Sequence, residues 1–292
     1  MTEIIVFIFI LLFGFFANWR FKIGKLKSIL KNLIAFIGAP ILIIHSVLSQ
    51  GRIEFGLVAL IIIFSLIINI ILSKIGNRIF NLKDRGCLLL LNSFANVGFL
   101  GLPLCWIVFG DQGIYYGSLY VVIGGLVHFF GIAMALREER TNWFSALKDS
   151  FKFPVFWTNL VILLILSLRI NFSIEVMDTL GFIGKATLYL IMFYVGLNLS
   201  KPESFRKFYQ QSLYVGVFRF LISPLVILIP SLIFNIEGRW VLTFQAMMPP
   251  AIFNIVVASF YRMNERLCSN ITTILTILFL LGFILIKLIV SA

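Results

Sequence analysis

Hydrophobic residues dominate this chain in ten long runs that are separated by short polar stretches. A membrane-spanning helix needs about 20 consecutive, predominantly apolar residues, and each run is close to that length. The pattern therefore predicts an all-α integral membrane protein with ten transmembrane helices. The predicted spans cover residues 3–18, 29–49, 54–73, 86–109, 113–136, 153–169, 177–199, 212–235, 239–261 and 266–290.

The longest polar stretch, residues 137–152, divides the ten predicted spans into two groups of five. Because five is an odd number, the second group must enter the membrane in the opposite sense to the first. Such inverted repeats are a common plan of secondary carriers. We therefore expect a first five-helix repeat at 1–136, a cytoplasmic loop at 137–152 and a second, inverted five-helix repeat at 153–292.

The basic residues predict how the chain is oriented in the membrane. The chain has 24 Lys+Arg against 12 Asp+Glu, and most of the basic residues lie in the odd-numbered connections between spans. The even-numbered connections carry only Arg52, Arg169 and Arg239. Because cytoplasmic loops are rich in Lys and Arg, we expect both termini outside the cell (inner) membrane. The net charge of +12 then reflects this orientation, and we expect no nucleic-acid partner.

The composition argues against a soluble enzyme. Hydrophobic residues make up 61% of the chain and charged residues 12%, whereas a soluble domain has about a quarter charged residues. The three cysteines form no CxxC pair, and the sequence has no Walker loop, HExxH or GxSxG motif. We expect no enzymatic activity, no metal site and no cofactor.

Two predicted spans are interrupted near their middles, at matching depths in the two halves. Span four contains Asn-Val-Gly-Phe-Leu-Gly-Leu-Pro at 96–103, and span nine contains Met-Pro-Pro-Ala-Ile-Phe-Asn at 248–254. Proline opens a helix because it lacks an N–H and clashes with the carbonyl four residues earlier. Open backbone within a membrane is tolerated only where it is buried in protein or lines a cavity. The N-terminus of each half-helix also favours an anion.

These interruptions predict a substrate site where spans four and nine cross. Neutral amide side chains and open backbone there offer hydrogen-bond donors and acceptors to a small organic anion. The expected substrate-binding residues are Asn92, Asn96, Gly98, Gly101, Pro103, Gln245, Pro249, Pro250 and Asn254.

Three stretches carry a resemblance to the auxin efflux carrier family. Residues 92–104 resemble the span-four crossover of that family, and residues 245–261 resemble its span nine. Arg219 followed by Pro224 in span eight also resembles a family pattern. The resemblance covers essentially the whole chain. The chain, however, lacks the long central loop of many plant PIN auxin exporters. The chain is therefore similar to a compact prokaryotic member of the family.

The resemblance implies a function that the residue pattern alone does not name. It implies transport of organic anions such as malate, malonate or an auxin-like acid, and it implies that Asn96 helps to hold the substrate carboxylate. The chain departs from the plant pattern at two positions. Ala95 stands where the PIN crossover has a proline, and Asn254 stands where their span nine often has another proline.

Arg219 is an ionisable residue predicted to lie within span eight, and such a residue is a functional hypothesis by default. We expect it to support the electric field at the site or to gate its inner opening. The alternative is that its side chain reaches the membrane surface or pairs with helix carbonyls. The roles of His45, His128 and Lys185 stay open at this point.

Two other functions remain open. A sodium-coupled symporter resembling the bile-acid carrier fold would place cation ligands at the same crossover. No acidic residue lies in the centre of a predicted span, so a sodium site would have to use carbonyls and amides. A non-transporting membrane receptor would use the cavity for binding alone, and the absence of a soluble output domain argues against it. The sequence leaves open the coupling ion, H⁺ or Na⁺, and a homodimer; its expected partners are the anion and membrane lipid.

Overall fold

The computed structural model describes residues 2–21, 24–49, 55–139, 148, 151, 154–168, 170, 172–198 and 208–291. These residues are mostly helical, and no β-strand occurs among them. Most of the cytoplasmic loop predicted at 137–152 lies outside the described residues.

The described residues belong to two compact units, and each unit takes segments from both halves of the chain. Unit 1 comprises Met1–Ala59, Val97–Leu126 and Phe153–Ser200. Unit 2 comprises Leu60–Asn96, Val127–Lys152 and Lys201–Ala292. The units are thus a different division of the chain from the two predicted repeats, whose inverted relationship stays a prediction.

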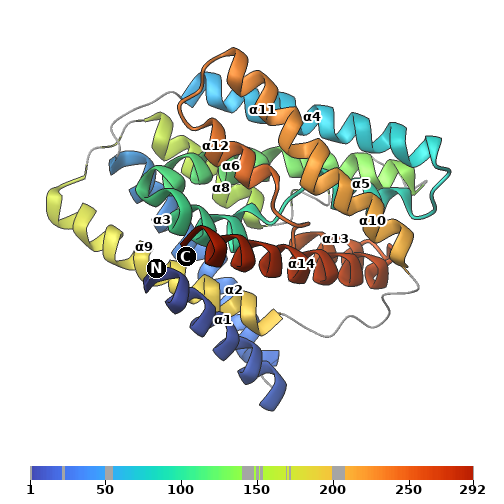
Figure 1. The fold of residues 1–292 in the computed structure, drawn as a ribbon. Helices are drawn as coiled ribbons and strands as arrows, with labels where there is room; N and C mark the ends of the chain where they lie inside the picture. The colour runs from blue at the N-terminus through green and yellow to red at the C-terminus, as the bar shows by residue number, and fades with distance from the viewer. Residues whose placement is uncertain are drawn as a thin grey trace. The chain divides into compact units, whose positions relative to one another are not determined.

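Unit 1 is built around α9, which packs along α1 and α3 (Figure 1). Its described elements are α1 (Thr2–Arg20), α2 (Gly24–Leu33), η1 (Ile34–Gly38), α3 (Ala39–Ser49), η2 (Val97–Gly101), the first part of α6 (Leu102–Glu138), α8 (Pro154–Ser167) and α9 (Ile174–Asn198). Glycines allow the close contact of α1 with α9. A Cβ added at Gly14 would lie 2.4 Å from the carbonyl oxygen of Phe193. Small residues of this kind let two membrane helices approach backbone to backbone.

Unit 2 contains the interruption predicted in span nine and only the first residue, Asn96, of the one predicted in span four. Its described elements are most of α4 (Phe55–Ile79), α5 (Arg85–Ser93), the end of α6, α10 (Tyr209–Val217), η4 (Phe218–Ile222), α11 (Ser223–Ile233), α12 (Arg239–Ala246), α13 (Phe253–Phe260) and α14 (Glu265–Ser291). Helix α14 lies along α10 and α13 (Figure 1). Buried apolar side chains of α5, α10 and α14 form the core there, including Leu88, Val215 and Ile271.

Three turns of the described helices are π-helical, and each ends two residues before a proline. The π turn η1 precedes Pro40, η2 precedes Pro103, and η4 precedes Pro224. In a regular α-helix the proline ring clashes with the carbonyl four residues earlier. The wider π turn relieves this clash without ending the helix, and such turns are frequent at functional sites.

Six helical stretches of the described residues are long and apolar enough to cross a membrane. They are Gly24–Ser49, Phe55–Ile79, Val97–Glu138, Ile174–Asn198, Tyr209–Ile233 and Glu265–Lys287. Two shorter apolar helices, Ile5–Arg20 and Phe156–Ile165, fall in the first and sixth predicted spans. The 42-residue stretch combines the second part of predicted span four with span five, and it is kinked at Gly110. The all-helical prediction with several spans is confirmed, whereas the count of ten stays a prediction.

Large apolar side chains cover the outer face of the helices. On α1 the rings of Phe9, Phe13 and Phe16 are 69%, 60% and 56% exposed. Their spacing of four and three residues places them on one face of the helix. Soluble proteins rarely expose a contiguous face of this kind, so it is suited to contact with lipid.

Candidate functional site

The two interrupted segments of unit 2 meet through backbone hydrogen bonds. Helix α5 is followed by non-helical residues 94–96, and helix α12 by non-helical residues 247–252. The N–H of Asn96 donates to the carbonyl oxygen of Pro249 at 2.8 Å. The N–H of Ala251 donates to the carbonyl oxygen of Phe94 at 2.9 Å. Each interrupted segment therefore pairs a backbone N–H and a carbonyl oxygen of the other that no helix would pair.

An isolated antiparallel bridge joins Ala95 to Pro250 between these two bonds. Proline has no N–H to donate, so Pro250 can occupy this position without leaving a donor unpaired. Asn254 then secures the same place from α13. Its Nδ2 donates to the carbonyl oxygens of Leu90 at 3.1 Å and Phe94 at 3.2 Å. Asn254 therefore caps the open carbonyl end of α5.

Arg219 in η4 is 1% exposed, and its guanidinium joins the ends of both interrupted helices. Its Nε donates to the carbonyl oxygen of Met248 at 3.1 Å, and its Nη2 donates to that of Ala246. Its Nη1 donates to the carbonyl oxygen of Asn92 at 2.8 Å and to Ser223 Oγ at 3.1 Å. The carbonyls belong to the C-terminal ends of α5 and α12, where the helix dipole favours a positive charge.

This geometry matches the pairing with helix carbonyls that the sequence left as the alternative for Arg219. The arginine fork supplies directed donors to groups on two different segments. A supporting or gating role in transport stays a prediction.

Two buried amide side chains near the interruptions have unused hydrogen-bonding capacity. Asn96 is 2% exposed and Gln245 is 0% exposed. Asn96 Nδ2 and both polar atoms of the Gln245 side chain have no hydrogen-bond partner among the described residues. Leaving a buried polar group unpaired costs about 1–3 kcal/mol. Such donors are the groups that a bound carboxylate would satisfy.

Asn92 is more firmly held than these two amides. Its Nδ2 donates to Ser73 Oγ of α4 at 2.9 Å, and its own carbonyl oxygen accepts from Arg219. The remaining side-chain atom, Asn92 Oδ1, has no partner within the described part of the chain. Asn92 therefore positions α5 against α4 and keeps one acceptor.

Three predicted site residues, Gly98, Gly101 and Pro103, fall in unit 1. The two glycines lie in η2, which packs on α9. The rings of Phe99 and Tyr194 form part of that contact, with centroids 5.1 Å apart. A Cβ added at Gly98 would meet no atom within 4 Å. Open space therefore lies beside Gly98, and a role for these three residues in binding stays a prediction.

An aromatic contact beside the interruptions was not anticipated from the sequence. The His128 ring stacks on Phe94 with centroids 4.0 Å apart, and it meets Phe253 edge-on at 5.5 Å. Gly131 makes room for Phe94, because a Cβ there would lie 2.1 Å from the Phe94 ring. The spacing of His128 and Gly131 places both on one face of α6. His128 thus packs on residues that flank both interruptions.

A row of polar residues along α4 was also not identified from the sequence. Ser65, Asn69, Ser73 and Asn77 are all buried. Their regular spacing of four residues puts them on one face of the helix, and this spacing was the available signal. Ser73 of this row binds Asn92, as described above, and its carbonyl oxygen accepts from the Tyr214 hydroxyl at 3.5 Å.

Comparison with known proteins identifies the family of the chain. The family model described as "Membrane transport protein" matches residues 1–286. A protein of Methanocaldococcus jannaschii, named as an uncharacterized transporter, is 29% identical over 299 residues. The match covers 95% of this chain and 96% of that relative.

Proposed function

Because the chain belongs to the membrane transport protein family, the family of the auxin efflux carriers, we propose that it transports a small organic carboxylate by alternating access. Malate, malonate or an auxin-like acid is the proposed class of substrate. Membership makes the protein a membrane transporter and agrees with the expectation that it is not an enzyme. The proposed site lies at the interruptions that follow α5 and α12.

The observation that carries the proposal is the pair of buried amides with unused donors. A bare carboxylate in a protein interior is unfavourable unless it is hydrogen-bonded or paired. Asn96 Nδ2 and Gln245 Nε2 are buried donors without a partner among the described residues. We assign the direct contact with the carboxylate to Asn96, with Gln245 as a second donor.

Arg219 has a different role in this proposal. Four hydrogen bonds direct its guanidinium to Ser223 and to backbone carbonyls. Its charge nevertheless stays beside the interruptions, where it makes the local potential more positive. We propose that Arg219 holds the two interrupted helices together and favours an anion without binding it directly.

Uptake into proteoliposomes tests the proposal. Purified protein is reconstituted, and entry of radiolabelled malonate, malate and indole-3-acetate is compared with protein-free vesicles. Saturable uptake of at least one acid is expected, with a strong reduction in Asn96→Ala. Asn198→Ala is the matched control, because Asn198 Nδ2 bonds within its own helix to the Tyr194 carbonyl oxygen. Absence of uptake for every carboxylate would contradict the proposed substrate class.

A sodium-coupled symporter is a second candidate, supported by unpaired oxygens. Asn92 Oδ1 and Gln245 Oε1 are buried and have no partner among the described residues. Neutral oxygens of this kind are ligands for a hard cation. The same vesicles distinguish the candidates, since an imposed sodium gradient would accelerate uptake of a symported acid and a proton gradient would not. Binding without any uptake would instead favour a receptor.

The proposal also fixes expectations for the setting of the protein. We place it in the cell membrane with both termini extracytoplasmic. A homodimer agrees with the proposal, and the mass of the purified protein in detergent would give the number of subunits.

A further inference from the structure

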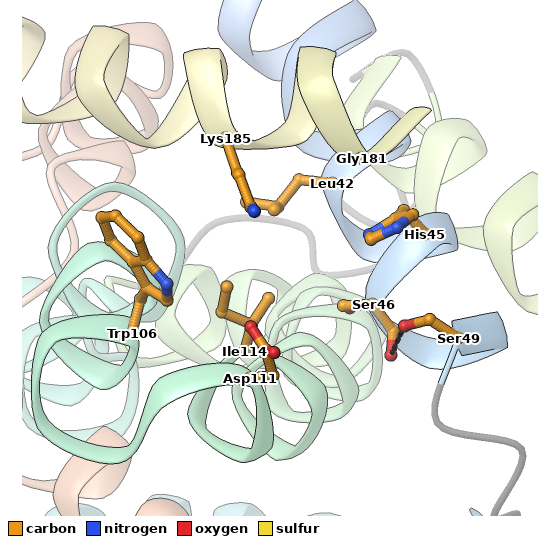
Figure 2. A pocket seen from close by; sticks show the side chains of 9 residues that line it. All are labelled: Leu42, His45, Ser46, Ser49, Trp106, Asp111, Ile114, Gly181 and Lys185. Atoms are coloured by element: carbon orange, nitrogen blue, oxygen red, sulfur yellow. Dashed lines mark hydrogen bonds between the residues drawn. The ribbon is translucent and has the colours of Figure 1, made fainter. Parts of the chain in front are cut away.

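Unit 1 contains a cavity of about 260 Å³ that the proposed transport site does not use. Its volume is near the lower end of small-molecule sites, which suits a small metabolite. Helices α3, α6 and α9 all contribute to its wall (Figure 2). The lining residues are Leu42, His45, Ser46, Ser49, Trp106, Asp111, Ile114, Gly181 and Lys185.

A cation and an anion line this cavity from opposite helices. Lys185 reaches from α9 toward the cavity, and Asp111 lies across from it on α6 (Figure 2). No ion pair within 4 Å joins these two residues in the part of the chain that the structure describes. Both charges therefore remain available to a molecule between them.

Backbone features hold these polar groups in place. Gly110 has φ of 61° and ψ of −142°, a conformation that favours glycine, and it precedes Asp111 directly. On the opposite wall, a Cβ added at Gly181 would lie 2.8 Å from His45 Nε2. The glycine therefore leaves room on α9 for the histidine ring at this position. Gly181 and Lys185 are four residues apart and so share one face of α9.

The rest of the wall combines apolar side chains with the neutral polar side chains of His45, Ser46 and Ser49. Leu42 and Ile114 contribute apolar side chains to the wall, and Trp106 contributes an aromatic one. The Trp106 ring meets Tyr189 of α9 edge-on, with centroids 5.8 Å apart. Ser46 is committed to other partners, because its hydroxyl bonds to the Ile43 carbonyl and to Ser118 Oγ. The cavity thus combines two opposite charges with a wall that is apolar in part.

We propose that this cavity binds a small zwitterionic α-amino acid with an apolar side chain, at a site separate from the carboxylate transport site. Lys185 binds the α-carboxylate, Asp111 binds the α-ammonium, and Trp106 contacts the side chain. A dicarboxylate is disfavoured by repulsion from Asp111, and a simple amine by repulsion from Lys185. A net-neutral zwitterion places each of its charges beside an opposite one.

Calorimetric titration of the purified full-length protein with three probes of one carbon skeleton tests this site. The probes are L-leucine, 4-methylpentanoate, which lacks the ammonium, and 3-methylbutylamine, which lacks the carboxylate. L-Leucine is expected to bind at least tenfold more tightly than either analogue. Lys185→Gln and Asp111→Asn should each weaken leucine binding at least tenfold. Asp111→Asn should also bind 4-methylpentanoate more tightly than the unmodified protein, because the repulsion is gone.

Two control variants distinguish this cavity from the transport site and from charges elsewhere on α9. Glu175→Gln removes an exposed carboxylate ten residues before Lys185 on α9, outside the cavity wall, and should leave leucine affinity unchanged. Asn96→Ala should also leave it unchanged, even where carboxylate transport is lost. Equal affinity for the three probes, no heat with leucine, or insensitivity to both charge variants would overturn the proposal. Loss of leucine binding in Asn96→Ala would place leucine at the transport site instead and would also overturn it.

Discussion

Arg219 Nη1 donates a hydrogen bond to the carbonyl oxygen of Asn92 at 2.8 Å, which ties the π turn η4 to the last turn of α5. Other donors of the same guanidinium reach the end of α12. The charge therefore sits at two helix C-termini, where both dipoles attract it. This arrangement makes Arg219 a structural link between the two interrupted helices.

Replacing Arg219 with lysine should lower the unfolding temperature of the protein. In Arg219→Lys a single ammonium cannot reach carbonyls on both helices, and each buried carbonyl left unpaired costs about 1–3 kcal/mol. The unfolding temperature should fall by about 2–4 °C for each kcal/mol lost. Tryptophan fluorescence during heating in detergent measures it. Arg78→Lys is the control, because that side chain is 61% exposed.

The binding step distinguishes the two roles of Arg219. Arg219→Lys should weaken carboxylate binding less than Asn96→Ala does. An unchanged unfolding temperature together with abolished binding would contradict this assignment and make Arg219 the primary ligand of the anion.

Asn96 and Asn254 should respond differently to replacement by alanine. Asn96→Ala removes a donor that has no partner among the described residues, so stability should change little. Losing a hydrogen bond to a charged group costs about 1.5–3 kcal/mol, so malonate affinity should fall by about 10- to 150-fold. Calorimetric titration with malonate measures this loss. Normal malonate affinity in Asn96→Ala would exclude a direct contact.

Asn254→Ala is the matched comparison. It removes the hydrogen bonds to the carbonyl oxygens of Leu90 in α5 and of Phe94 just after it, so the unfolding temperature should fall along with any change in binding. An equally stable Asn254→Ala variant would show that the cap on α5 is dispensable.

The sequence predicted the location of the interruptions better than their chemistry. Proline lacks a donor wherever it occurs, so Pro249 and Pro250 marked the opening in span nine without knowledge of the fold. The hydrogen bonds of Arg219 reach backbone carbonyls of residues 27 and 127 positions away in the chain. Hydropathy gives the depth of a residue in a span but not its neighbours on other helices.

The stacking of His128 on Phe94 illustrates the same limit. It joins His128 of α6 to Phe94, which follows the end of α5 and lies 34 positions earlier in the chain. Neither residue type predicts a contact with the other. The division into two units could not be predicted either, because α4 and α6 each contribute residues to both units. A hydropathy plot separates spans but does not say which of them pack together.

Removing the two adjacent prolines should impair transport while leaving membrane insertion intact. In the Pro249→Ala, Pro250→Ala double variant the backbone regains two N–H donors, so α12 and α13 can join into one helix. Proteoliposome uptake of malonate measures the loss. Pro230→Ala, inside α11, should transport normally, whereas normal transport by the double variant would exclude the broken-helix mechanism.

Reporter fusions test the orientation that the basic residues predict. A periplasmically active reporter fused after residue 292 should be active, and one inserted within 141–147 should be inactive. A cytoplasmically active reporter should give the opposite result at both positions. A cytoplasmic C-terminus would contradict both the count of ten spans and the inverted repeat.

The contact of α1 with α9 should depend on the absence of a side chain at Gly196. A Cβ there would lie 2.1 Å from the carbonyl oxygen of Leu11, and that atom belongs to the backbone, so α1 as a whole must move. Overpacking of this kind typically costs about 1–3 kcal/mol, so Gly196→Ala should lower the unfolding temperature by several degrees. Gly282→Ala in α14 is the matched control, because an added Cβ meets no atom within 4 Å. Alanine is favoured over glycine in a helix by about 1 kcal/mol, so this control should be as stable as the unmodified protein or more so. Equal unfolding temperatures for the two variants would mean that α1 is not held against α9 at this point.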